Sequence, residues 1–212
     1  MSIVKKFLNI ILLPGSVYKR ITDKKLTLIL GIFFVGIVDL VFAMVDNFKG
    51  YFSEGDLGKT VFNIALAILF IVLLGVVDVL FFSLPMFDLF KRFKKSEGLS
   101  ITNETGQFVK LVKIYVIAHF LILIPQIIMF LIYQNVISTL NINSWWLYLA
   151  FFIDLIIPIW FSGAISRGVN VIYKFRTIFA RLSFLVLFVW NYVLGYALSY
   201  IISNWIIPLF KV

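Results

Sequence analysis

Three carboxylates and one histidine lie inside long apolar stretches of this chain. Asp39, Asp78 and Asp154 each interrupt a run of mostly apolar residues. His119, the only histidine, interrupts another. Ionisable groups held against lipid are costly, so such residues typically face neighbouring helices or a water-filled cavity, where they form ion or proton pathways. The pattern indicates either a proton or cation relay or polar contacts that hold helices together.

The depth of each group within its run predicts which of them can meet. At about 1.5 Å per helical residue, Asp39 lies about 20 Å above the start of its run and Asp154 about 14 Å below the opposite boundary. These two acids therefore share the outer half of a membrane, and we expect a site built from them with Gln126 nearby. Asp78 and His119 lie nearer the inner boundary, where they could pair with each other.

Other kinds of chemistry find little support in the sequence. The chain has no cysteine, which excludes disulfides and thiolate chemistry, and a single histidine excludes a multi-histidine metal centre within one chain. The nucleotide-binding P-loop, the GxSxG elbow and the HExxH zinc motif are also missing from the sequence. We therefore expect no enzyme activity, no metal and no cofactor.

The composition predicts the elements that must position these residues. Of the 212 residues, 62% are hydrophobic and only 14% are charged, and the mean hydropathy is +1.07, well above that of a soluble domain. We predict an all-α polytopic membrane protein, a bundle of five transmembrane helices preceded by an interfacial amphipathic helix within residues 1–25. The membrane domain covers residues 26–212, with Pro85 ending the second span. The predicted spans are about 26–45, 60–84, 111–136, 145–166 and 182–209.

The basic residues predict the orientation of these spans. The segments 1–25, 86–113 and 167–181 share one side and hold 16 of the 19 Lys and Arg residues, whereas the other side holds three. By the positive-inside rule the N-terminus is cytoplasmic and the C-terminus is outside, and we expect a bacterial cytoplasmic membrane. The same rule accounts for the net charge of +9, so no nucleic-acid partner is expected.

Two basic groups on the predicted cytoplasmic side are candidate contacts for anionic lipid headgroups. The first is Lys5 and Lys6 in the N-terminal segment. The second is the run of Lys91, Arg92, Lys94 and Lys95 after the second span. Lipids are therefore the expected partners, together with other membrane proteins.

The segment LLPGSVYKRITDKKLTLIL resembles the opening of Yip1-domain proteins. The resemblance rests on Pro14, Ser16, Tyr18, Arg20 and Ile21, which precede the first of five spans. It implies a small non-enzymatic membrane protein of the compact prokaryotic type; eukaryotic relatives are associated with vesicle traffic and membrane curvature. The expected function is a protein that organises membrane or partner proteins through lipid and helix contacts. The alternative is a small permease or a proton- or cation-coupled transporter that uses the intramembrane carboxylates.

Overall fold

The computed structural model describes residues 9–44, 48–52, 57–100, 103–137 and 145–211, and these residues form helices and their connections without a β-strand. From Gly15 onward the elements are α2 (Gly15–Lys19), α3 (Leu26–Met44), α4 (Phe48–Phe52), α5 (Leu57–Ser96), α6 (Glu104–Ile137), α7 (Trp145–Tyr173) and α8 (Thr177–Ile201). The last helix continues as a π-helical turn, η2 (Ile202–Ile206), and a 3-10 turn, η3 (Ile207–Lys211).

Five of these helices are long and apolar enough to cross a membrane: α3, α5, α6, α7, and α8 with its terminal turns. This confirms the all-α class and the five candidate spans predicted from the sequence. Outward-facing apolar side chains on α5 and α8 agree with a lipid environment, since large residues such as Phe62, Leu69 and Val193 are more than half exposed.

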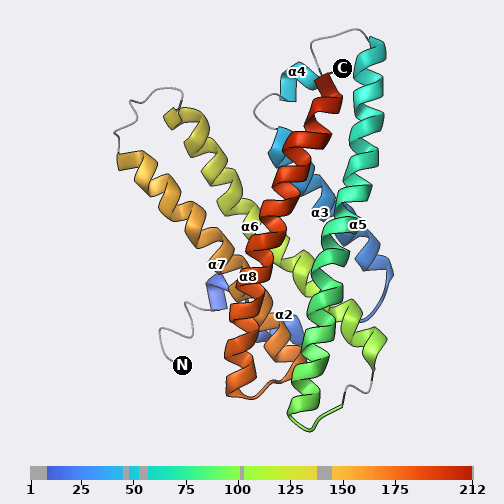
Figure 1. Cartoon of the computed structure of the whole chain (residues 1–212), viewed down its shortest axis with the longest axis vertical. Coiled ribbons are helices and arrows are strands. Elements are labelled where there is room, and N and C mark those ends of the chain that lie inside the picture. Colours follow the sequence, from blue (N-terminus) through green and yellow to red (C-terminus); the bar gives the residue numbers. More distant parts are fainter. Residues whose placement is uncertain (1–8, 45–47, 53–56, 101–102, 138–144, 212) are drawn as a thin grey trace.

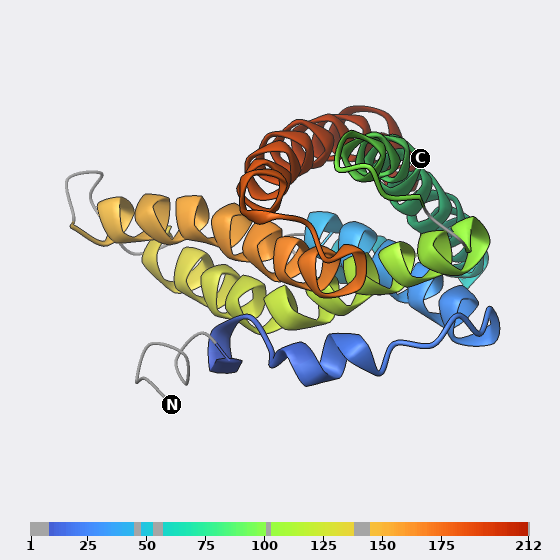
Figure 2. The same cartoon turned by 90° about the horizontal axis from the view of Figure 1, so that it is seen from below.

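The helices form two groups that diverge toward one end of the molecule. In Figure 1, α6 and α7 run side by side and lean away from α3, α5 and α8. Figure 2 shows the same pairing from below, with α2 lying along the outer side of α6 and α7. We call the end that carries the α5–α6 and α7–α8 connections the lower end, and the end that carries α4 and the C-terminus the upper end.

Helix α5 does not stop at Pro85, where the sequence predicts the end of the second span. It continues to Ser96, because the hydrogen bond that proline cannot donate is replaced from another helix. A prolyl nitrogen leaves the carbonyl four residues earlier without its partner, and that carbonyl belongs to Phe81. The indole Nε1 of Trp190 on α8 donates to the Phe81 carbonyl at 3.2 Å. Rescue of a freed carbonyl by a neighbouring helix is how membrane helices tolerate proline.

Helix α6 likewise extends beyond the predicted third span. Helix α6 begins at Glu104, well before the predicted position 111. Asn103 stabilises this start because its Oδ1 accepts the backbone N–H of Gly106 at 2.9 Å. Helices α5 and α6 therefore both extend beyond the predicted lower boundaries of their spans.

The described part of the N-terminal segment is docked against α7. Tyr18 is 1% exposed, and its hydroxyl donates to the Leu12 carbonyl at 3.0 Å and to the Ala164 carbonyl at 3.1 Å. Trp160 of α7 donates to the Ile11 carbonyl at 2.6 Å. Burial raises the pKa of Tyr18 to about 12, so the hydroxyl keeps its proton and remains a donor at neutral pH. The segment is thus anchored to α7 by two hydrogen bonds, one from the Tyr18 hydroxyl to the Ala164 carbonyl and one from Trp160 to the Ile11 carbonyl.

Two apolar cores lie one above the other. The lower core is the larger and fills the space between α5, α6, α7 and α8 with residues such as Phe82, Phe90 and Ile165, each buried almost completely. The upper core joins α3 and α5 to the end of α8, through Leu40, Leu74 and others. Asp39 follows Val35 of the lower core and precedes Leu40 of the upper core along α3. Asp78 lies between Leu74 of the upper core and Val79 of the lower core along α5. Both acids therefore lie where the two cores meet.

Candidate functional site

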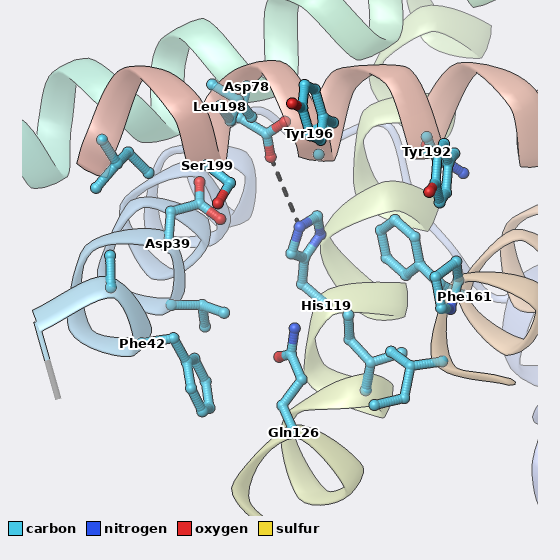
Figure 3. Close-up of a pocket in the computed structure, with 18 of the residues that line it drawn as sticks. Asp39, Phe42, Asp78, His119, Gln126, Phe161, Tyr192, Tyr196, Leu198 and Ser199 are labelled. Atoms are coloured by element: carbon cyan, nitrogen blue, oxygen red, sulfur yellow. Dashed lines mark ion pairs between the residues drawn. The ribbon is translucent and has the colours of Figure 1, made fainter. Parts of the chain in front are cut away.

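Asp39, Asp78 and His119 meet in the middle of the bundle, although they come from three different helices. One ligand atom of each lies within 4.8 Å of the others, and His119 Nε2 is 3.6 Å from Asp78 Oδ2. Figure 3 shows the carboxylate of Asp39 and the ring of His119 directed toward Asp78. We call these three residues the acid–histidine cluster. They form the only such group of three or more potential metal-ligating side chains among the residues that the structure describes.

Close contact between α3 and α5 brings the two acids together. A Cβ on Gly36 would lie 1.8 Å from the Ile71 carbonyl oxygen, and a Cβ on Gly75 would lie 2.1 Å from the Ile32 carbonyl oxygen. The two backbones therefore touch at a point where only glycine fits. Each glycine is followed three residues later by an acid, in the sequences GIVD (36–39) and GVVD (75–78). The repeated Gly-x-Val-Asp pattern is a sequence signal that could have paired Asp39 with Asp78.

The full lengths of α5 and α6 place Asp78 and His119 well inside the bundle. The lower ends of these two helices are Ser96 and Glu104. Counted from those ends at about 1.5 Å per residue, Asp78 and His119 lie about 27 and about 22 Å along their helices. The sequence predicts a lower position for Asp78 because it ends the second span at Pro85.

Tyr115 holds Asp78 in place and was not foreseen as a site residue. Its hydroxyl donates to Asp78, at 2.8 Å from Oδ1 and 3.0 Å from Oδ2, and its ring stacks on Phe82 with centroids 3.8 Å apart. Tyr115 precedes His119 by four residues, so the two side chains share a face of α6. That spacing was a possible signal, but a tyrosine in an apolar run looks like ordinary packing until its partner on another helix is known.

The backbone fixes the hydrogen-bonding state of His119. Its Nδ1 lies 3.0 Å from the Tyr115 carbonyl oxygen, which can only accept, so Nδ1 carries the proton. In the neutral ring Nε2 then has a lone pair, and this atom faces the carboxylate of Asp78. The imidazole is also held edge-on between the rings of Tyr115 and Phe161. Two electron-rich atoms therefore face each other, an arrangement that a proton or a metal cation between them would stabilise.

A cavity of about 570 Å³ opens beside the cluster, and all five spans contribute to its wall. Its lining residues are Val38, Asp39, Phe42, Ala43, Asp78, Tyr115, His119, Ile122, Gln126, Ile157, Pro158, Phe161, Asn191, Tyr192, Gly195, Tyr196, Leu198, Ser199 and Ile202. From the cluster the lining continues along α3, α6 and α8 toward the upper end, whereas the lower core closes the other side. The volume is in the range of small-molecule sites.

Several polar atoms around the cavity have no hydrogen-bond partner. They are Asp39 Oδ2, Gln126 Oε1 and Asn191 Oδ1. Asn191 is only 9% exposed, and its Nδ2 donates to Ser162 Oγ at 3.1 Å. Buried polar atoms are normally satisfied, so three unpartnered acceptors around one cavity indicate that a positively charged or hydrogen-bonding species completes them.

The described lining of the cavity carries carboxylates without a lysine or an arginine to balance them. Two carboxylates line it, and the described lining residues include no lysine or arginine. Burying uncompensated carboxylates is strongly unfavourable, so they must be neutralised by protons or by a bound cation. The arrangement can therefore take up and release a positive charge in the middle of the helical bundle.

Two further residues, Gln126 and Asp154, were predicted to belong to the intramembrane site. Gln126 lines the same cavity, as expected for a residue near Asp39. Asp154 belongs to α7, but its side chain lies outside the described residues, as do Lys5 and Lys6. From the sequence, Asp39 was expected to pair with Asp154, and Asp78 with His119. In the structure, Asp39 lies beside Asp78 and His119.

The basic run after the second span is largely paired with acids. Lys91 contacts Glu104 at 2.6 Å and Arg92 contacts Asp88 at 2.8 Å, and all four side chains are substantially exposed. Lys95 is exposed as well. Lys94 differs, because it is 9% exposed, lies 3.7 Å from Glu97 and covers the ring of Phe175. Lys94 therefore holds the lower end of the bundle together and does not present its charge to a headgroup.

Comparison with protein-family models, with curated proteins and with solved structures finds no match for this chain. Any assignment of function therefore rests on the geometry of the acid–histidine cluster and its cavity.

Proposed function

We propose that this protein is a small cation-coupled membrane carrier whose acid–histidine cluster binds the coupling cation. The observation that carries the proposal is the position of Asp39, Asp78 and His119 within 4.8 Å of one another at the base of a cavity lined by all five spans. Clustered ionisable residues at this depth are expensive to maintain, and in membrane proteins they mark substrate and ion pathways. A purely structural role would be served by fewer charges with all their acceptors paired.

The basic residues suggest how this carrier is oriented. The described residues of the segments 9–25, 86–113 and 167–181, which belong to the lower half of the molecule, include 14 Lys and Arg residues, so we propose that the lower end faces the cytoplasm. The cavity then extends from the cluster toward the outside, and the lower core closes the cytoplasmic side. In this orientation the cation enters from the outer face and reaches the carboxylates without crossing the apolar core. The N-terminal segment would lie at the cytoplasmic interface, beside α7.

The divergence of the helices suggests a way to alternate access. The pair α6–α7 leans away from α3, α5 and α8 at the upper end. Movement of this pair toward α8 would close the cavity above the cluster, and separation at the lower end would open the other side. Because α6 carries His119 and Tyr115, the same movement would change the distance between His119 and the two acids, and would couple cation binding to the conformation.

A membrane-organising role of Yip1 type is the second candidate. The observation that favours it is the role of Tyr18, a residue of the resembling segment, whose hydroxyl anchors that segment to the Ala164 carbonyl of α7. In such a protein the docked segment and the lipid-facing helices would carry the function, and the acid–histidine cluster would serve only to join helices. The two proposals therefore predict opposite outcomes for ion flux.

The test is ion flux in sealed liposomes that contain the purified protein and a pH-sensitive dye. Pulses of H⁺, Na⁺ and Mn²⁺ are applied outside, with valinomycin and potassium to set the membrane potential, and protein-free liposomes serve as the baseline. We expect at least one cation gradient to change the internal pH, or to be dissipated, faster than in protein-free liposomes. Baseline rates for every gradient would overturn the carrier proposal and favour the membrane-organising role.

A further inference from the structure

We propose that the acid–histidine cluster is a binding site for a divalent transition-metal ion, with Asp39, Asp78 and His119 Nε2 as the protein ligands. The role of the metal as transported or coupling cation rests on the proposed carrier function, but the binding site itself does not. The sequence alone predicts no metal, because one histidine cannot build a multi-histidine centre. Carboxylates from two other helices supply the missing ligands.

The donor set selects the class of metal. Imidazole nitrogen suits Zn²⁺, Fe²⁺, Ni²⁺ and Cu²⁺, whereas Mg²⁺ and Ca²⁺ prefer sites built from oxygen alone. Two carboxylates with one imidazole therefore favour a transition metal. Thiolate-preferring ions have no suitable ligand, since the chain contains no cysteine. The open cavity beside the cluster leaves room for water or another ligand in the remaining coordination positions.

Both ends of the ligand set are oriented by one residue. The backbone carbonyl of Tyr115 accepts a hydrogen bond from His119 Nδ1–H, and the Tyr115 hydroxyl donates a hydrogen bond to Asp78. A metal-binding histidine almost always donates its second ring N–H to a carbonyl or carboxylate, and metal-binding carboxylates are themselves hydrogen-bonded. The outer shell of a metal site is thus present around His119 and Asp78, and it directs Nε2 toward the carboxylate.

The spacing of the ligand atoms is close to that of a filled site. Zinc–ligand bonds of about 2.1 Å in a tetrahedron place neighbouring ligand atoms about 3.4 Å apart. His119 Nε2 and Asp78 Oδ2 are already 3.6 Å apart. The three ligand atoms, one from each residue, all lie within 4.8 Å of one another. A side-chain adjustment of about 1.4 Å at Asp39 would complete the set. No hydrogen bond to Asp39 Oδ2 opposes this adjustment.

Charge and polarity at the site also match a divalent ion. One M²⁺ ion balances the two carboxylates and leaves the site neutral with an uncharged imidazole, whereas a monovalent ion would leave one negative charge buried. Asn191, which is 9% exposed and lines the same cavity, has an unpartnered Oδ1, and Gln126 has an unpartnered Oε1. Both oxygens are suitable partners for metal-bound water.

The test is a Co²⁺ titration of the detergent-purified protein without a polyhistidine tag. The d–d absorption reports the coordination directly, and calorimetry with Zn²⁺ and Mn²⁺ gives the affinity. We expect one site per chain, weakened at least tenfold in Asp39→Asn and in His119→Gln, and unchanged in Asp88→Asn, which alters an exposed acid on the same helix as Asp78. Circular dichroism identifies any variant that fails to fold, and His119→Gln, which keeps a polar side chain, then carries the test.

Three results would overturn the metal site. They are an absence of saturable Co²⁺ binding in the folded wild type, equal affinity in His119→Gln, and equal competition by Mg²⁺ or Ca²⁺. The liposome experiment separates this inference from the carrier proposal. Flux of H⁺ or Na⁺ without metal binding would refute the metal site and support the carrier proposal. Stoichiometric metal binding without any flux would support the metal site and refute the carrier proposal.

Discussion

Replacement of Gly36 by alanine should separate α3 from α5 and disrupt the acid–histidine cluster. The added Cβ would lie 1.8 Å from the Ile71 carbonyl oxygen, whereas ordinary contact begins at 3.4 Å, so the helices must part by about 1.6 Å. The obstacle is a backbone carbonyl in the middle of a helix, which cannot turn away as a flexible side chain could. The separation must therefore be taken up by the helices themselves.

The expected loss of stability follows from two opposing effects. Forcing extra volume into a packed contact costs about 1–3 kcal/mol, sometimes more. Alanine is favoured over glycine in a helix by up to about 1 kcal/mol, which offsets part of this loss. We therefore expect Gly36→Ala to reduce the free energy of unfolding by about 2 kcal/mol. Asp39 lies one helical turn from the substitution and should move away from Asp78, so Co²⁺ affinity should fall as well.

Thermal unfolding in one detergent, followed by near-UV circular dichroism, measures this effect. Gly195→Ala is the matched control, because a Cβ on Gly195 of α8 meets no atom within 4 Å. Its melting temperature should equal or exceed that of the wild type. Gly75→Ala should resemble Gly36→Ala, and the double variant should lose less than the sum, since helices already parted by one methyl group accommodate the second. A Gly36→Ala protein as stable as the wild type would refute the direct backbone contact.

Three further predictions concern the connections around the site. Trp190→Phe should lower the free energy of unfolding by about 1 kcal/mol. In a Pro85→Ala background it should have little effect, because residue 85 then donates its own N–H to the Phe81 carbonyl. Equal losses in the two backgrounds would contradict the role of Trp190 as the replacement donor. In this cysteine-free chain, Ser199→Cys should react with a membrane-impermeant maleimide in intact vesicles, whereas Ser183→Cys, at a position 0% exposed, should not. Burial raises the pKa of Tyr18 from 10.0 to about 12, so the free energy of unfolding is unaffected by this residue below pH 10 and falls by about 3 kcal/mol as the pH rises from 10 to 12. In Tyr18→Phe the melting temperature should change less with pH in that range. A variant with the same alkaline slope as the wild type would contradict the burial of the Tyr18 hydroxyl.

The class of fold could be predicted from the sequence because it depends on local composition. Each apolar run is long enough to cross a membrane by itself, and no information from the rest of the chain is needed to recognise it. The start of α3 at Leu26 and the capping role of Asn103 follow from equally local signals. Helix ends that depend on another element could not be foreseen. Pro85 marks the end of a helix unless Trp190 supplies the missing donor, and this contact joins α5 to α8, which are far apart in the sequence.

The site was predicted in its components but not in its grouping. Asp39, Asp78, His119 and Gln126 were singled out because ionisable and amide groups are rare in apolar runs. Their partners could not be assigned, because helix rotation and crossing points are tertiary properties. Ending the second span at Pro85, when α5 in fact runs on to Ser96, was enough to place Asp78 at a different depth from Asp39. Tyr115 was missed because its role depends entirely on Asp78, a residue of another helix.

A comparison of flux in Asp39→Asn and Asp88→Asn would decide whether the cluster carries the cation. Both substitutions remove one carboxylate, but Asp39 belongs to the cluster and has an unpartnered oxygen, whereas Asp88 is exposed and paired with Arg92. The two variants and the wild type are reconstituted at the same protein-to-lipid ratio, and the initial rate is measured for the cation gradient that the wild type dissipates. We expect wild-type flux for Asp88→Asn and the rate of protein-free liposomes for Asp39→Asn. Equal flux in both variants would show that the cluster only joins the helices, and the assignment of the cation site to the cluster would then be wrong.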